Sequence, residues 1–109
     1  MVSLPAILTP HAVTVRRLTG EGAHGPVHAG PVTLRRVRVE ATTRLVRDRT
    51  GAETTSTARL FTRPEHGPVP PGSLVLLDEG TALERWATVI SAAHQYTPPA
   101  PEHYDHALT

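Results

Sequence analysis

The amino-acid sequence predicts an all-β domain, and three observations carry this prediction. Eleven prolines and eight glycines divide the 109 residues into short segments. These segments are rich in valine, threonine and leucine, as strands bounded by turns are, whereas helix signals are nearly missing. The length predicts a single domain, residues 1–109, with one modest core.

Composition excludes several classes of protein and site. The absence of cysteine excludes disulfides, thiol catalysis and thiolate metal sites. No run of about 18 apolar residues occurs, so no membrane-spanning helix is expected. The N-terminus lacks the pattern expected of a signal peptide. Because a secreted protein this small would often need disulfides, an intracellular origin or assembly with partners is expected. The net charge of +1 argues against a dedicated DNA-binding protein, since neutralising phosphates requires a large cationic surplus.

The first strand is predicted at residues 11–18, where Val13 and Val15 share one face. Residues 19–31 follow, and their glycine content predicts a loop without regular structure. The next strand, residues 32–40, changes phase, because its apolar residues have even numbers at first (32 and 34) and odd numbers later (37 and 39). An extra residue at Arg35 and Arg36, a β-bulge, would turn both sets inward and bend the strand, which favours a barrel over a sandwich.

A β-hairpin is predicted in the middle of the chain. Residues 44–47 and 53–62 have the composition of strands. The segment 48–51 between them ends in a glycine, which suits the left-handed conformation of a tight turn. In the second strand we expect Ala58 and Leu60 to face inward.

The rest of the chain alternates proline-rich loops, at 63–72 and 95–102, with short strands. A strand is expected at 73–77, which is apolar on both faces and therefore covered on both sides. Another is expected at 86–94, where three consecutive β-branched residues outweigh the helix-like alanines. The last is expected at 103–108, with Tyr104 and Leu108 on one face.

The usual catalytic signatures are missing. The chain has no lysine for a phosphate-binding loop, no GxGxxG after a strand and no GxSxG. The nearest approach to a metal motif is His103, Asp105 and His106, but in a strand His106 points away from the other two. We therefore predict neither an enzyme nor a metal or cofactor site, and the long loops indicate a function in interaction.

The order of several motifs resembles a known family. LTPHAVTV near the N-terminus leads into the glycine-rich segment, and a hairpin reading RLVRDRTGAETTSTARL follows. VPPGS then enters a strand, followed by WATVI and by PEHYDHAL at the end. From about Leu8 to Leu108 the chain resembles the head-tail connector proteins of long-tailed bacteriophages, specifically the stopper (head-closure) family from phages of GC-rich hosts.

The resemblance implies a small SH3-like or OB-like β-barrel with long loops. It implies a homo-oligomeric ring, a hexamer or a dodecamer, beneath the portal and adaptor at the head-tail interface of the virion. Such proteins are made in the host bacterial cytoplasm, close the channel around packaged DNA, and dock the tail terminator or tail tube. They have no membrane partner.

In that family a loop between barrel strands projects into the channel. By position, its counterpart here is the protruding hairpin 43–55, and residues 1–10 would form an N-terminal arm. The candidate channel-facing residues at the tip of the hairpin are Arg47, Asp48, Arg49 and Gly51.

Two other classes of function remain open. The first is a tail terminator or another tail-tube ring protein, and a tail terminator would carry helices packed on a sheet. The second is an OB-like nucleic-acid-binding module, which would need basic residues clustered on one face of the barrel.

Overall fold

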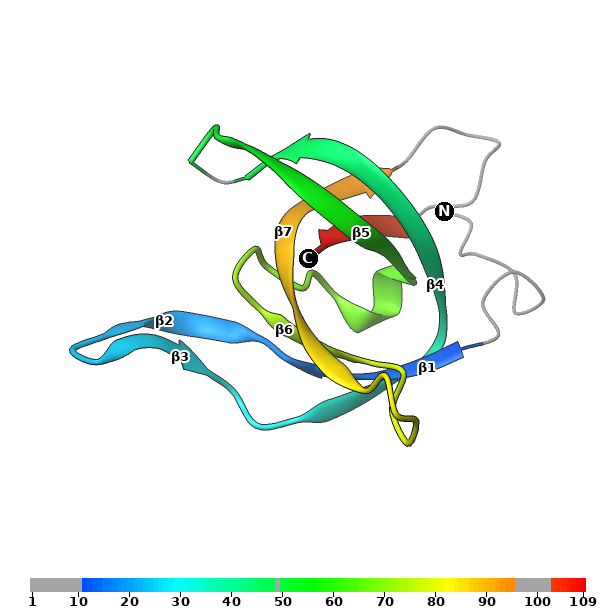
Figure 1. Cartoon of the computed structure of the whole chain (residues 1–109). Helices are drawn as coiled ribbons and strands as arrows, with labels where there is room; N and C mark the ends of the chain where they lie inside the picture. Colours follow the sequence, from blue (N-terminus) through cyan, green and yellow to red (C-terminus); the bar gives the residue numbers. More distant parts are fainter. Residues whose placement is uncertain (1–10, 49, 96–102) are drawn as a thin grey trace.

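The computed structural model describes residues 11–48, 50–95 and 103–109, which form a closed six-stranded barrel and a separate two-stranded hairpin (Figure 1). The elements are β1 (His11–Arg16), β2 (Leu18–Gly22), β3 (Gly25–His28), β4 (Val32–Arg47), β5 (Glu53–Thr62), the 3-10 turn η2 (Pro64–His66), β6 (Leu74–Leu77), β7 (Arg85–Gln95) and β8 (His103–Leu108). The predicted all-β class is confirmed. The predicted N-terminal arm, Arg49 and residues 96–102 lie outside the described residues.

The strands follow the order β1-β4-β5-β8-β7-β6 around the barrel, and neighbouring strands are antiparallel. β1, β4 and β5 lie side by side, and the chain then crosses to β6, which pairs with the other side of β1 through Thr14–Leu76 and Val15–Val75. This is a Greek-key arrangement. An OB-fold is also a Greek-key barrel, with five strands. Closure removes the free edges that an open sheet would expose.

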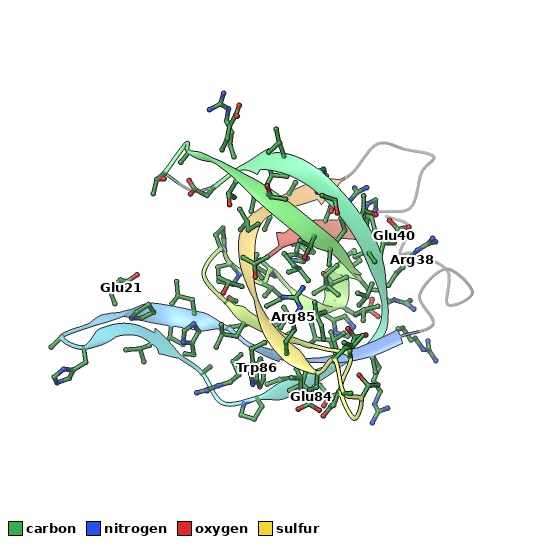
Figure 2. All side chains as sticks on the ribbon, viewed as in Figure 1. Glu21, Arg38, Glu40, Glu84, Arg85 and Trp86 are labelled. Carbon is green, nitrogen blue, oxygen red and sulfur yellow. The ribbon has the colours of Figure 1, made fainter. Side chains whose placement is uncertain are left out.

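One continuous core fills the barrel. Its buried members come from the inward-facing positions of six strands and from the loop after β5: Val13, Val15, Leu34, Val37, Ala58, Leu60, Val69, Val75, Leu77, Ala87, Val89 and Leu108. The inward faces predicted for β1 and β5 are therefore confirmed. Trp86, by contrast, is 45% exposed and lies on the outside of β7 (Figure 2).

The β-bulge predicted at Arg35 and Arg36 is present in β4. On β1, Ala12 pairs with Arg35 and His11 pairs with Val37, which leaves Arg36 as the extra residue. Its φ is 58°, in the left-handed region that a residue other than glycine rarely adopts. Because of the extra residue, even-numbered side chains face inward before the bulge and odd-numbered side chains face inward after it.

The bulge turns inward the apolar residues next to it, but it does not turn inward all four of the expected residues (32, 34, 37 and 39). Leu34 and Val37, on either side of it, are both buried. Val39 is partly buried against the core. The expectation for Val32 is wrong: it is 48% exposed, because it begins β4 at the end of the barrel.

Two expected loops are strands. Most of the expected loop 19–31 belongs to the β2–β3 hairpin, which is paired from Leu18–His28 to Gly22–Gly25. Gly25 has φ of 110°, so glycine here permits a tight reversal instead of preventing regular structure. The interruption expected between strands at 41–43 is absent, because β4 continues to Arg47. A register shift between Ala41 and Arg44 accommodates the irregular pattern of apolar and polar residues in this segment.

The positive φ of Arg36 leads to a testable prediction, and the neighbouring Arg38 is the control position. Arg36→Gly should raise the free energy of unfolding by about 0.5–1 kcal/mol, because glycine adopts positive φ without the clash that Cβ causes. Arg38→Gly, on the same exposed face but with ordinary backbone angles, should lower it by about 0.5–1 kcal/mol. Urea unfolding of both variants measures the difference. Equal effects at the two positions would contradict the strain assigned to Arg36.

Candidate functional site

The hairpin formed by the end of β4 and the start of β5 extends beyond the barrel (Figure 1). Pairs from Arg44–Ser56 to Arg47–Glu53 join these two strands, whereas β5 pairs with β8 only from Ala58 onward. The outer part of the hairpin is therefore two strands wide within the described residues. Leu45 on this part is 70% exposed.

The tip of the hairpin is held together by Asp48. Its Oδ1 accepts hydrogen bonds from the backbone N of Thr50 (2.9 Å), the Oγ1 of Thr50 (2.6 Å) and the backbone N of Ala52 (3.1 Å). The Thr50 hydroxyl, followed by these backbone donors, lowers the pKa of the Asp48 carboxyl. Gly51, with φ of 87°, supplies the left-handed residue of the turn. The candidate residues Asp48 and Gly51 thus form a tight, self-bonded turn.

Arg47, the first candidate residue at the tip, bonds within its own hairpin. Its Nη1 donates to the carbonyl of Gly51 at 2.8 Å, and its Nη2 lies 3.7 Å from Oε1 of Glu53. Both side chains of this ion pair are more than 60% exposed, so the pair is weak and the guanidinium stays accessible. Arg49 lies outside the described residues, so the predicted pairing of two arginines on one face stays a prediction.

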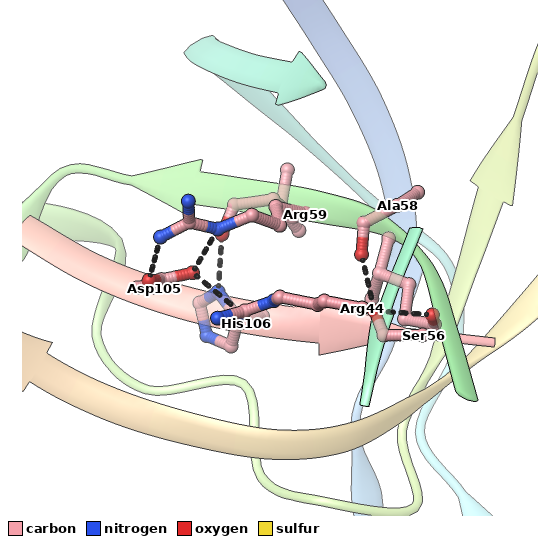
Figure 3. A network of polar contacts seen from close by, with 8 residues as sticks. Arg44, Ser56, Ala58, Arg59, Asp105 and His106 are labelled. Carbon is pink, nitrogen blue, oxygen red and sulfur yellow. Dashed lines mark hydrogen bonds and ion pairs between the residues drawn. The ribbon is translucent and has the colours of Figure 1, made fainter. Parts of the chain in front are cut away.

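A polar network links the base of the hairpin to β8 (Figure 3). The buried Ser56 hydroxyl lies 2.9 Å from the carbonyl oxygens of Leu108 and Ala58. On the outer face, Asp105 of β8 lies 3.8 Å from Nη2 of Arg44 and accepts two hydrogen bonds from Arg59. The hydrogen bonds that Arg59 donates to Asp105 raise the pKa of Arg59. Because β8 belongs to the barrel, these contacts hold the hairpin in one direction.

Sequence reasoning missed this role of Asp105. The strand pattern placed Asp105 and His106 on opposite faces, and the structure agrees: Asp105 faces the arginines outside, and His106 is fully buried inside the barrel. His103 instead packs near Phe61, with ring centroids 5.6 Å apart. The arginine partners of Asp105 lie on β4 and β5, so the spacing of residues within β8 could not predict them.

His106 is the one titratable side chain in the described core. Its Nδ1 lies 3.0 Å from the carbonyl oxygen of Leu60, and since a carbonyl can only accept, Nδ1 carries the hydrogen. Its Nε2 is buried with no hydrogen-bond partner among the described residues. Charging the ring would place an unpaired N–H in the core, and this burial lowers the pKa of His106 below its ordinary value of 6.5.

A depression of about 720 Å³ opens between the start of β1 and the end of β6. Most of its lining is apolar, and it is formed by Ala12, Val13, Val39, Ala41, Thr57, Ala58, Leu76, Leu77, Asp78, Glu79 and Arg85. The Nη2 of Arg85 donates to Oγ1 of Thr57 (3.1 Å) and to the carbonyl of Thr109 (2.8 Å), which fixes it against β5 and the C-terminus.

The buried His106 makes stability depend on pH in a defined direction. In the unfolded chain this ring is protonated near pH 6.5, whereas in the folded chain it is protonated only at a lower pH. The contribution of the neutral ring to the free energy of unfolding is therefore fully present above pH 6.5 and falls as the pH drops below it. The loss should reach at most about 1.4 kcal/mol per pH unit. Urea unfolding between pH 7.5 and pH 5.5 should show a smaller loss in His106→Gln than in the parent. His28→Gln, at a partly exposed ring, should behave like the parent, and equal slopes in all three chains would refute the assignment.

No group of three or more metal-ligating side chains occurs among residues 11–48, 50–95 and 103–109. In the same residues no helix is long and apolar enough to cross a membrane. No protein-family model, curated protein or solved structure matches the chain. The geometry of the hairpin and the barrel surface, together with the resemblance of the motifs, are therefore the basis for inferring a function.

Proposed function

We propose that this chain is a structural protein of the phage neck, a head-to-tail stopper. It forms a homo-oligomeric ring, a hexamer or a dodecamer, beneath the portal and adaptor, closes the DNA channel after packaging and docks the tail terminator or tail tube. The site of action is the head-tail interface of the virion. The resemblance of the motifs along nearly the whole chain suggested this function, and three features of the structure support it.

The observation that carries the proposal is a hairpin that leaves a closed barrel and is held rigidly at its base. Ser56, Arg44 and Arg59 connect the hairpin to β8 through Leu108 and Asp105. A channel closed by repeated copies of one element needs that element to project in a fixed direction from every subunit. The β4–β5 hairpin meets this requirement, because its base cannot swing without breaking buried contacts.

Two further features distinguish the candidate classes. The described residues contain no α-helix, only the three-residue turn η2, which supports a stopper over a tail terminator with helices packed on a sheet. Several arginines outside the hairpin tip are also paired within the chain: Arg38 with Glu40, and Arg44 and Arg59 with Asp105. Pairing lowers the charge available to phosphates, which supports a channel wall that DNA must pass over a nucleic-acid-binding module.

Removing the chain from the virus tests the proposed function directly. Heads assembled without it should package DNA, then lose it and fail to join tails, because the channel stays open and the docking surface is missing. Electron microscopy of lysates and nuclease-protected DNA in purified heads measure both effects. Supplying the chain in trans should restore filled, tailed particles. Tailed, infectious particles in its absence would refute the function.

The hairpin tip should contribute to DNA retention through its arginines. Replacing Arg47 and Arg49 with serine should leave the melting temperature within a few degrees of the parent, since the ion pair that Arg47 makes with Glu53 is exposed and stabilises little. Filled heads carrying this variant should leak DNA, because a ring of tips without arginine loses its charge-assisted bonds to phosphate. Glu53→Ser is the matched control: it removes the ion-pair partner of Arg47 but keeps the arginines, and heads should retain DNA. Full retention in the double variant would exclude the tip from closure.

A further inference from the structure

The depression of about 720 Å³ is one end of the barrel, because five of the six barrel strands contribute to its lining: β1, β4, β5, β6 and β7. Ala12, Ala41 and Ala58 lie in this lining, one from each of the first three strands. Alanine side chains are too short to fill the hollow, which therefore stays open above the buried Val13 and Leu77. We call this hollow the barrel mouth. An apolar surface left open in this way marks a site of contact.

The ten residues before β1 have the composition of a segment that packs against apolar surface. They read MVSLPAILTP, with no charged side chain and with apolar residues at 1, 2, 4, 6, 7 and 8. The segment leads directly into His11, and the next residue, Ala12, lines the barrel mouth. A segment tethered this close to a site has a high effective concentration there, so it outcompetes the same segment of another copy.

The pairing of β1 with β4 determines where a continuation of β1 would run (Figure 1). The last pair of these antiparallel strands joins His11 to Val37, so a continuation in this register places residue 7 opposite residue 41. Residues directly opposite each other in an antiparallel pair point to the same face of the sheet. Because Ala41 lines the barrel mouth, Ile7 would face the mouth, whereas its neighbour Leu8 would point away from it.

We propose that residues 1–10 continue β1 along β4 and cover the mouth of their own barrel, with the side chain of Ile7 in the depression. The apolar lining of the mouth and the uncharged, apolar segment are then removed from water together. The prolines at 5 and 10 fit a strand at the edge of a sheet, where a missing backbone N–H breaks no ladder. This contact goes beyond the proposed function, because it is internal to the chain and does not require a ring.

Two matched substitutions test the burial of Ile7. Ile7→Asp and Leu8→Asp add the same charge at adjacent positions. Ile7→Asp should lower the melting temperature of the purified chain by at least about 5 °C, because it places a carboxylate in the apolar mouth. Leu8→Asp should leave it within about 2 °C of the parent, since that side chain faces solvent. Thermal unfolding at neutral pH, followed by circular dichroism, measures both variants. Equal effects, or a larger effect in Leu8→Asp, would overturn the placement.

Introduced thiols locate the segment. The chain has no cysteine, so only the added pair can form a disulfide. Under a mild oxidant, Ile7→Cys with Ala41→Cys in one chain should form a disulfide at least about tenfold faster than Leu8→Cys with Ala41→Cys, because side chains that point apart cannot be bridged without backbone movement. Non-reducing electrophoresis and mass spectrometry identify monomers with an internal disulfide. Their rate of formation should not depend on chain concentration, since the segment belongs to the same chain.

The outcomes separate an internal cover from other occupants of the mouth. A selective loss of stability in Ile7→Asp and a concentration-independent disulfide between positions 7 and 41 support the proposal, whether or not heads without the chain lose DNA. Disulfide-linked dimers that form faster at higher chain concentration would show that the segment covers the mouth of another copy, and would overturn it. Equal disulfide rates for the two cysteine pairs would also overturn it, because the segment would then not follow β4 in this register.

Discussion

The insertion of β8 between β5 and β7 is the constraint on which the other features of this protein depend. Both sides of this strand are paired, from Ala58–Leu108 to Thr62–Tyr104 on one side and from Val89–Leu108 to Gln95–His103 on the other. Its inward residues complete the core, while its outward Asp105 holds two arginines at the base of the β4–β5 hairpin. The same strand therefore completes the barrel and sets the direction of the candidate functional element.

Local irregularities let so short a chain close into a barrel. β4 contains one extra residue at Arg36 and a second register shift between Ala41 and Arg44, and β7 has a shift between Val89 and Ser91. Each bulge bends its strand and increases twist, which a small barrel requires. At Arg36 the cost is a positive φ in a residue with a side chain. The benefit is that Leu34 and Val37 both enter the core.

Some charged side chains form ion pairs within the chain, whereas others have no partner among the described residues. Arg44 and Arg59 at the base of the hairpin pair with Asp105, and Arg38 in β4 pairs with Glu40. These ion pairs contribute to the fold. The side chains of Arg35 and Arg36 at the bulge and of Asp78 and Glu79 at the β6–β7 turn have no such partner among the described residues. A net charge of +1 conceals this division, because it counts paired and unpaired charges alike. The distribution on the surface, and not the total, bears on what the protein binds.

By itself, the sequence determined the all-β class, most of the strands and the bulge at Arg35 and Arg36, because alternation and turn residues act over a few neighbouring positions. It also placed Asp105 and His106 on opposite faces. It misjudged the β2–β3 hairpin, because glycine content alone does not separate a turn between strands from a loop. Only the tertiary structure decided that Asp105 meets Arg44 and Arg59, because this contact depends on the order of strands around the barrel. That order arises from pairing between segments distant in the chain, which no local pattern encodes.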